Sequence, residues 1–167
     1  MIARKTKIIL ATSLAFVSVL AFGQKPLFDE APRSAAKPVV VFLYPEQVTI
    51  PAGKPATINL HFRVASGLHI NSHTPNEPEL IPAVFSIPAG SGVRLDGVIY
   101  PPGADFTLPL DPTTRLSVYS GEFTIQARIV AAPGNHLIEA ALRYQACDNN
   151  ACMPPKSITA AFDVIGK

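Results

Sequence analysis

The chain has 167 residues, 48% of them hydrophobic and 16% charged, and its formal net charge is +2 at pH 7. Positions 1–23 hold three basic residues and no acidic residue, so the rest of the chain carries a formal charge of −1. This balance, without any basic cluster, argues against nucleic acid as a partner. The remaining roughly 144 residues suffice for one domain with a sizeable core.

The first segment, residues 1–23, places its basic residues ahead of an apolar run from Ile8 to Phe22 and ends on Gly23. A basic start, a short apolar run and a small residue predict a secretory signal peptide. An uncleaved membrane anchor is the alternative, but the run of about 15 residues is shorter than the about 20 of a spanning helix. The chain is therefore expected to be exported.

Residues 24–37 mix proline, alanine and charged residues without periodicity, which predicts a flexible leader. A folded domain is expected over residues 38–167. Because this domain lies outside the cytoplasm, a cysteine pair in it can be oxidised and remain oxidised.

Strand patterns begin after the leader. Residues 56–64 and 122–130 alternate apolar and polar side chains, as half-buried strands do. Less regular apolar runs, each bounded by proline, glycine, asparagine or aspartate, lie at 38–44, 68–70, 80–87, 92–100 and 157–165. No stretch of about 12 residues shows a helical stripe. The pattern predicts an all-β fold, an antiparallel β-sandwich of seven to nine short strands.

The only two cysteines, Cys147 and Cys152, lie in the stretch RYQACDNNACMPPK. The alternation of residues 136–147 puts Ile138 and Leu142 on the inward face and Cys147 on the outward face, at the end of a strand. The residues DNNA that follow are typical of a turn. If the cysteines face each other as a non-hydrogen-bonded antiparallel pair, their α-carbons lie about 4.5 Å apart, which permits a disulfide.

Energetics alone leave the purpose of this pair open. A disulfide that closes a loop of about six residues stabilises a fold by only roughly 2 kcal/mol. A domain with this many apolar strands hardly needs that contribution. Pro154 and Pro155 fix the backbone that leaves Cys152. A permanent structural cystine and a redox-active pair both fit the spacing.

The block YQACDNNACMPP, with GLHINS and LIP before it and VYSGEFTI between, resembles the N-terminal periplasmic domain of the thiol-disulfide interchange protein DsbD. The resemblance spans about Val39 to Ile165. It implies an immunoglobulin-like sandwich in the periplasm. It also implies a cysteine pair that takes electrons from a membrane-embedded thiol reductase. The pair would pass them to thioredoxin-like proteins, including those of cytochrome c maturation, or to disulfide isomerases.

The resemblance also assigns roles to residues. Cys147 and Cys152 become the catalytic pair of a thiol-disulfide oxidoreductase domain, and Cys152 forms the mixed disulfide with target proteins. The family covers its disulfide with an aromatic cap loop, for which Tyr100 in GVIYPPG is the candidate. The acidic residues and the phenylalanine usual in that cap are absent here, and Asp96 is the only nearby carboxylate. Since the chain stops at Lys167, its electron donor is expected to be another polypeptide.

Two other interpretations compete with thiol exchange. One is a non-catalytic β-sandwich that binds a protein partner and carries a structural disulfide. The other is a copper-handling module that uses His69 and His73, but a spacing of four residues aligns two side chains on one face only in a helix. We therefore expect no metal site, no cofactor and a monomeric protein.

Overall fold

The computed structural model describes residues 37–43, 47–109 and 111–167. The predicted signal peptide, residues 1–23, and the leader up to residue 36 lie outside the described residues. Contacts group Lys37–Lys167 into one compact unit.

The described residues form strands and no helix, so this part of the chain offers no helix that could cross a membrane. In chain order the strands are β1 (Val40–Leu43), β2 (Gln47–Ile50), β3 (Ala56–Val64), β4 (His69–Asn71), β5 (Val84–Ser86), β6 (Val93–Ile99), β7 (Ala104–Leu108), β8 (Asp111–Tyr119), β9 (Glu122–Ala131), β10 (Gly134–Tyr144), β11 (Ala146–Cys147) and β12 (Lys156–Gly166).

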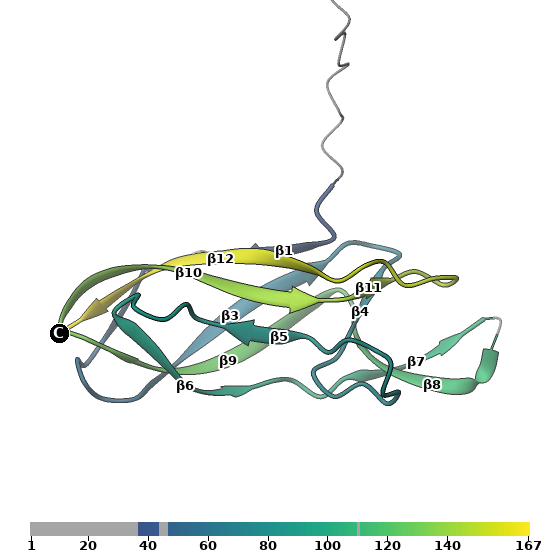
Figure 1. Cartoon of the computed structure of the whole chain (residues 1–167), viewed down its shortest axis with the longest axis horizontal. Coiled ribbons are helices and arrows are strands. Elements are labelled where there is room, and N and C mark those ends of the chain that lie inside the picture. The colour runs from purple at the N-terminus through teal and green to yellow at the C-terminus, as the bar shows by residue number, and fades with distance from the viewer. Residues whose placement is uncertain (1–36, 44–46, 110) are drawn as a thin grey trace, which may run out of the picture. The chain divides into compact units, whose positions relative to one another are not determined.

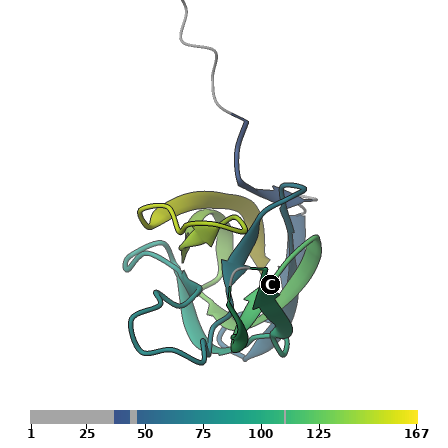
Figure 2. The same cartoon turned by 90° about the vertical axis from the view of Figure 1, so that its right-hand side faces the viewer.

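The strands belong to three sheets, with the orders β1-β3-β9-β6, β2-β12-β10-β5 and β11-β4-β8-β7. All pairings are antiparallel except that of β2 with β12. The first two sheets enclose the main core, as the view along the strands in Figure 2 shows, and the third lies at one end of them (Figure 1). The fold is an all-β, immunoglobulin-like sandwich, as predicted.

The core follows from the alternation of side chains along the long strands. On β3, Ile58, Leu60, Phe62 and Val64 are buried, whereas the residues between them are exposed or partly exposed. The inward residues of β9, β10 and β12 are buried in the same way. Phe62 lies at the centre and stacks on Phe123 with ring centroids 5.5 Å apart. The predicted inward faces of 56–64 and 122–130 are confirmed.

The structure has twelve strands in its described part, more than the seven to nine predicted. The strands that were not predicted from the sequence are β2, β7 and β8. The first half of β8, Asp111 to Arg115, is polar and exposed or partly exposed, because the β7–β8 hairpin extends beyond the main core. This half of β8 buries neither face, so it has no apolar alternation to reveal it. This hairpin, β4 and β11 form the third sheet, and β11 carries Cys147.

Candidate active site at the cysteine pair

Cys147 and Cys152 form a disulfide with an S–S distance of 2.06 Å and α-carbons 3.9 Å apart. The two residues face each other as an isolated antiparallel bridge. Hydrogen bonds flank the bridge on both sides: the amide of Asp148 donates to Ala151, and that of Met153 donates to Ala146. This is the non-hydrogen-bonded pair predicted from the sequence, with α-carbons closer than the expected 4.5 Å.

An aspartate closes the turn between the cysteines. Oδ1 of Asp148 accepts hydrogen bonds from the amides of Asn150 (2.7 Å) and Ala151 (2.8 Å). These bonds hold the pKa of the Asp148 carboxyl below its ordinary value, because they favour the charged form. The side chain thus fixes the reversal of the chain that brings Cys152 back to Cys147.

The two cysteines differ sharply in exposure. Cys147 is 1% exposed, whereas Cys152 is exposed. The predicted outward position of Cys147 was therefore wrong. Strand β10 ends at Tyr144, and the chain then enters a different sheet, where Cys147 pairs with His69 of β4. The alternation of β10 does not continue across this change of sheet, so Ala146 and Cys147 are both buried.

A hydrogen-bond network behind the disulfide involves Gln145, the residue that follows β10. Its Oε1 accepts hydrogen bonds from Nδ2 of Asn71 (3.0 Å) and from the amide of Ile81 (3.1 Å). Nδ2 of Asn71 also donates to the carbonyl of Ile81. On its other side, Gln145 donates to the carbonyl of Met153. Gln145 thus ties the strand of His69 and the segment after Cys152 to the strand of Cys147.

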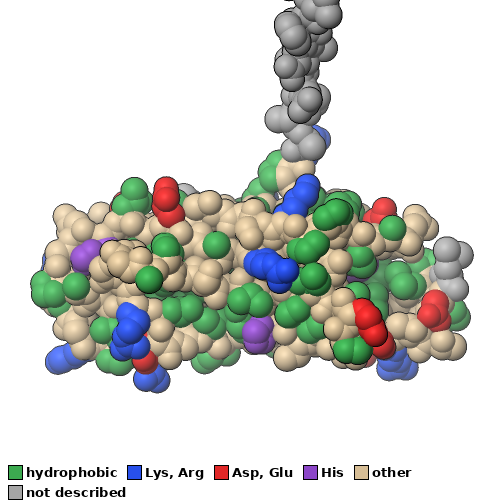
Figure 3. Space-filling view, in the orientation of Figure 1, with side chains coloured by type: hydrophobic (Ala, Val, Ile, Leu, Met, Phe, Trp, Pro, Cys, Tyr) green, Lys and Arg blue, Asp and Glu red, His purple; other side chains and the backbone are tan. Residues whose placement is uncertain are grey.

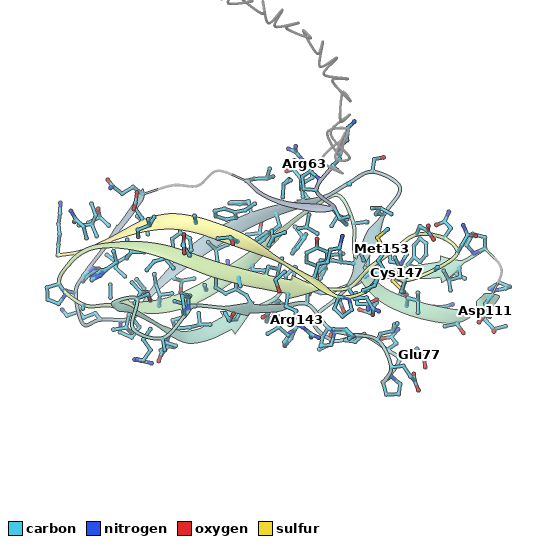
Figure 4. The ribbon with its side chains drawn as sticks, turned by 45° about the horizontal axis from the view of Figure 1, so that its top comes forward. Arg63, Glu77, Asp111, Arg143, Cys147 and Met153 are labelled. Atoms are coloured by element: carbon cyan, nitrogen blue, oxygen red, sulfur yellow. A yellow bond between two sulfur atoms is a disulfide. The ribbon has the colours of Figure 1, made fainter. Side chains whose placement is uncertain are left out.

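A cavity of about 300 Å³ opens beside the disulfide. Both cysteines line it, together with His69, Leu80 and residues of the β7–β8 hairpin, Leu108 and Leu116. Three carboxylates, those of Glu77, Glu79 and Asp148, also border it. The face in Figure 3 shows acidic side chains beside apolar surface at this end of the molecule. Figure 4 shows Cys147 near the base of the hairpin, Asp111 at its tip and Glu77 on the neighbouring loop.

His69 is the buried polar residue of this cavity. It is directly opposite Cys147 in the register of β4 and β11, and it is 3% exposed. Its ring lies 4.3 Å from that of Phe106, centroid to centroid. None of the described residues forms a hydrogen bond to its Nε2 atom. Burial lowers the pKa of His69 below 6.5, and the charge of Asp148 opposes this shift.

Tyr100, the cap candidate from the sequence, lies in another cluster. Its ring stacks on His73 at a centroid distance of 3.8 Å, and its hydroxyl accepts a hydrogen bond from the amide of Phe85. It does not line the cavity beside the cysteines, which is bordered instead by Leu108 and Leu116. Asp96 is also elsewhere, because its carboxylate binds Arg94 and Arg128.

The two histidines considered for copper have different surroundings. His69 faces the cysteines, whereas His73 is exposed and its Nδ1 atom pairs with the carbonyl of Ala83 at 2.9 Å. Within the described ranges, no group of three or more histidine, cysteine, aspartate or glutamate side chains could hold a metal ion.

The family can now be assigned. The model of the family "Thiol:disulfide interchange protein DsbD, N-terminal" matches residues 40–163, well over half of the chain. The chain belongs to this family. The range matched by this DsbD N-terminal family contains the disulfide hairpin, β4 and the β7–β8 hairpin. A search of curated protein sequences found no match.

Two solved structures are similar to the chain. One is the N-terminal domain of DsbD from Neisseria meningitidis in the reduced form, 20% identical, with 69% of this chain and 81% of that one covered and a TM-score of 0.44. The other is the N-terminal periplasmic domain of ScsB from Proteus mirabilis, 12% identical. It covers 74% of this chain and 44% of its own, with a TM-score of 0.48.

Proposed function

We propose that this protein is a periplasmic thiol-disulfide interchange domain that passes electrons through Cys147 and Cys152. The donor would be a membrane-embedded thiol reductase, and the acceptors would be thioredoxin-like or disulfide isomerase proteins of the periplasm. Membership of the DsbD N-terminal family supports the reaction class. The signal peptide predicted from residues 1–23 supports the compartment.

The observation that carries the proposal is the unequal exposure of the two sulfur-bearing residues. Thiol exchange needs one cysteine that a partner can reach and a second that resolves the mixed disulfide. The exposed Cys152 meets the first requirement, and the buried Cys147, held opposite it, meets the second. A purely structural cystine has no need of an open cavity beside one of its sulfurs.

The exchange runs in two balanced steps. In the first, the thiolate of Cys152 attacks the partner's disulfide, a mixed disulfide forms, and one partner thiolate leaves and takes a proton from solvent. In the second, Cys147 attacks the Cys152 sulfur, the bond to the partner breaks, and the second partner thiol is released. Two electrons and two protons reach the partner, and the Cys147–Cys152 disulfide remains.

We assign the cover of the site to the β7–β8 hairpin rather than to Tyr100. Leu108 and Leu116 of this hairpin line the cavity, and Phe106 packs on His69. An apolar wall beside an exposed sulfur limits access by water and small thiols. It also gives the cysteine-bearing loop of a partner an apolar surface to pack against. The role left for Tyr100 is to hold the loop of His73, through their stacked rings.

The test is a pair of single substitutions in the full chain. Cys147→Ser leaves a reachable thiol at Cys152 and is expected to trap partners as mixed disulfides in periplasmic extract. Cys152→Ser leaves only the buried thiol and should trap far fewer. The reduction potential, measured in graded thiol buffers, should lie well above the roughly −300 mV typical of structural disulfides. A potential far below that value, with no trapped species from either variant, would leave a stapled binding domain.

A further inference from the structure

His69 is a buried polar side chain that the exchange scheme does not yet use. Among the described residues, the buried polar or charged side chains are those of His69, Asn71 and Ser72. Asn71 donates through Nδ2 to Gln145, although its Oδ1 atom has no partner among the described residues, and the hydroxyl of Ser72 pairs with that of Ser117. Nε2 of His69 has no such bond to the described residues. A buried polar atom without a partner costs about 1–3 kcal/mol, so its retention calls for a reason.

The register places this imidazole beside the resolving cysteine. His69 is the direct antiparallel partner of Cys147, and Cys147 is in turn the direct partner of Cys152. Directly opposed residues of antiparallel strands project their side chains to the same face, with Cβ atoms about 4.5–5.5 Å apart. The side chains of His69, Cys147 and Cys152 therefore form one row that runs from β4 across β11 to the bridge at Cys152, and all three line the same cavity.

The second step of exchange creates a need for a base at this position. Only the thiolate attacks a disulfide, and a thiol in apolar surroundings forms its thiolate poorly because burial disfavours the charge. Cys147 is 1% exposed, so solvent reaches its thiol poorly. Cys152, which is exposed, can lose its proton to water directly.

We propose that Nε2 of His69 accepts the thiol proton of Cys147 as Cys147 attacks the mixed disulfide at Cys152. This inference rests on the thiol-exchange function proposed above. The S–H bond of Cys147 breaks, its electron pair forms the bond to the Cys152 sulfur, and the Cys152–partner bond breaks. The departing partner thiolate then takes up the proton from the imidazolium, so that His69 ends the cycle neutral.

The other titratable groups around the cavity are less suited to this task. The Asp148 carboxylate already binds two amides of its own turn. Glu77 and Glu79 are exposed on the opposite loop, and the side chains that the β7–β8 hairpin contributes, Leu108 and Leu116, cannot titrate. The buried imidazole is in its neutral form at neutral pH, since burial lowers its pKa, and only the neutral form can accept a proton.

A small disulfide reagent separates the two steps. Reduced full-length chain is mixed with 5,5′-dithiobis(2-nitrobenzoate), which releases one coloured thiolate when Cys152 attacks and a second when Cys147 resolves. We expect His69→Gln, a neutral side chain of similar polarity, to slow the second release by about tenfold or more at pH 7 and to leave the first within about twofold. The deficit should shrink as the pH rises, because hydroxide then supplies the thiolate.

The matched control is His136→Gln, at the opposite end of the domain, where the imidazole pairs with the carbonyl of Ala132. It should change neither release. Equal slowing of both releases by His69→Gln would indicate a merely structural role, and an unchanged second release would exclude His69 as the base. Absence of a fast first release in the unsubstituted chain would instead contradict the exchange function itself.

A measurement on the unsubstituted chain covers the case in which His69→Gln does not fold. The imidazole signals of His69 are followed by nuclear magnetic resonance against pH in the oxidised and reduced forms. A base beside the Cys147 thiol should titrate differently in the two forms, because the thiolate of the reduced form attracts the imidazolium. Superimposable titration curves would overturn the proposal.

Discussion

The sandwich body and the cysteine end of the domain are held together by different kinds of interaction. In the body, residues such as Ile125, Ile129, Ile138 and Leu142 are fully buried, and apolar side chains interdigitate between two sheets. At the cysteine end, the described part of the chain buries His69, Asn71 and Ser72, all within four positions of β4 and its continuation. Apolar packing secures the body, and directional hydrogen bonds position the cysteines. Stability and chemistry can therefore be disturbed separately.

The largest difference between the effect on stability and the effect on thiol exchange is expected from a substitution that leaves a cavity in the body. Phe62 is fully buried between Phe42 and Phe123, so Phe62→Ala should lower the free energy of unfolding by about 3–5 kcal/mol. Thermal and denaturant unfolding measure this change. The release of nitrothiobenzoate by the folded fraction should stay as in the unsubstituted chain. A loss of the second release at temperatures where the variant is folded would show that the two regions are coupled.

The next largest effect is expected from a substitution in the hydrogen-bond network of Gln145. Gln145→Leu leaves Nδ2 of Asn71 and the amide of Ile81 without their shared acceptor, at about 1–3 kcal/mol for each donor. Unlike Phe62→Ala, this change should also slow exchange, because Gln145 fixes the strand of Cys147 relative to Met153. The matched control is Gln126→Leu on the exposed face of β9, which should change neither quantity. Normal exchange by Gln145→Leu would show that the network is structural only.

How far sequence predicts the molecule differs between the two regions for a physical reason. In the body, Ile58 to Val64 and Phe123 to Ile129 were assigned correctly to the inward face, because one buried face imposes a period of two. At the site, Cys147 broke that rule because the chain changes sheets after Tyr144. The pairing of the two cysteines was predictable from the turn residues between them. The position of His69 beside Cys147 depends on the register of β4 with β11, and a strand of only three residues does not show its register in the sequence.

Tyr100 illustrates the same limit. The family resemblance made Tyr100 the candidate cap of the disulfide, yet its ring stacks on that of His73. The residues that do line the cavity, Leu108 and Leu116, lie on the β7–β8 hairpin, whose two strands are not among those predicted from the sequence. The family resemblance suggested the roles proposed for Cys147 and Cys152, whereas the residues around them were identified only by the fold.

A smaller effect on stability is expected from the disulfide. Replacing both cysteines by serine removes a loop constraint worth roughly 2 kcal/mol, which corresponds to a fall of several degrees in the melting temperature. The transition should remain cooperative, because none of the sandwich core depends on the bond. Calorimetry of the double variant and the oxidised chain measures the difference. Loss of folding would show that the disulfide is needed for the stability of the sandwich, as expected of a structural cystine.

The smallest effect concerns the tip of the β7–β8 hairpin. The carboxylate of Asp111 accepts hydrogen bonds from the hydroxyl groups of Thr113 and Thr114 and from both of their amides. These bonds lower the pKa of Asp111 from 3.8 to about 2, so the folded hairpin favours the ionised form. The contribution of Asp111 is therefore fully present above pH 3.8 and is lost as the pH falls through about 2.

Because Asp111 is on the surface, its protonation should change the hairpin locally and leave the body folded. The amide signals of Thr113 and Thr114 should shift together with a midpoint near pH 2, while those of β3 and β9 stay constant. Asp111→Asn should abolish the titration. A midpoint at or above 3.8 would mean that the turn bonds do not persist in solution.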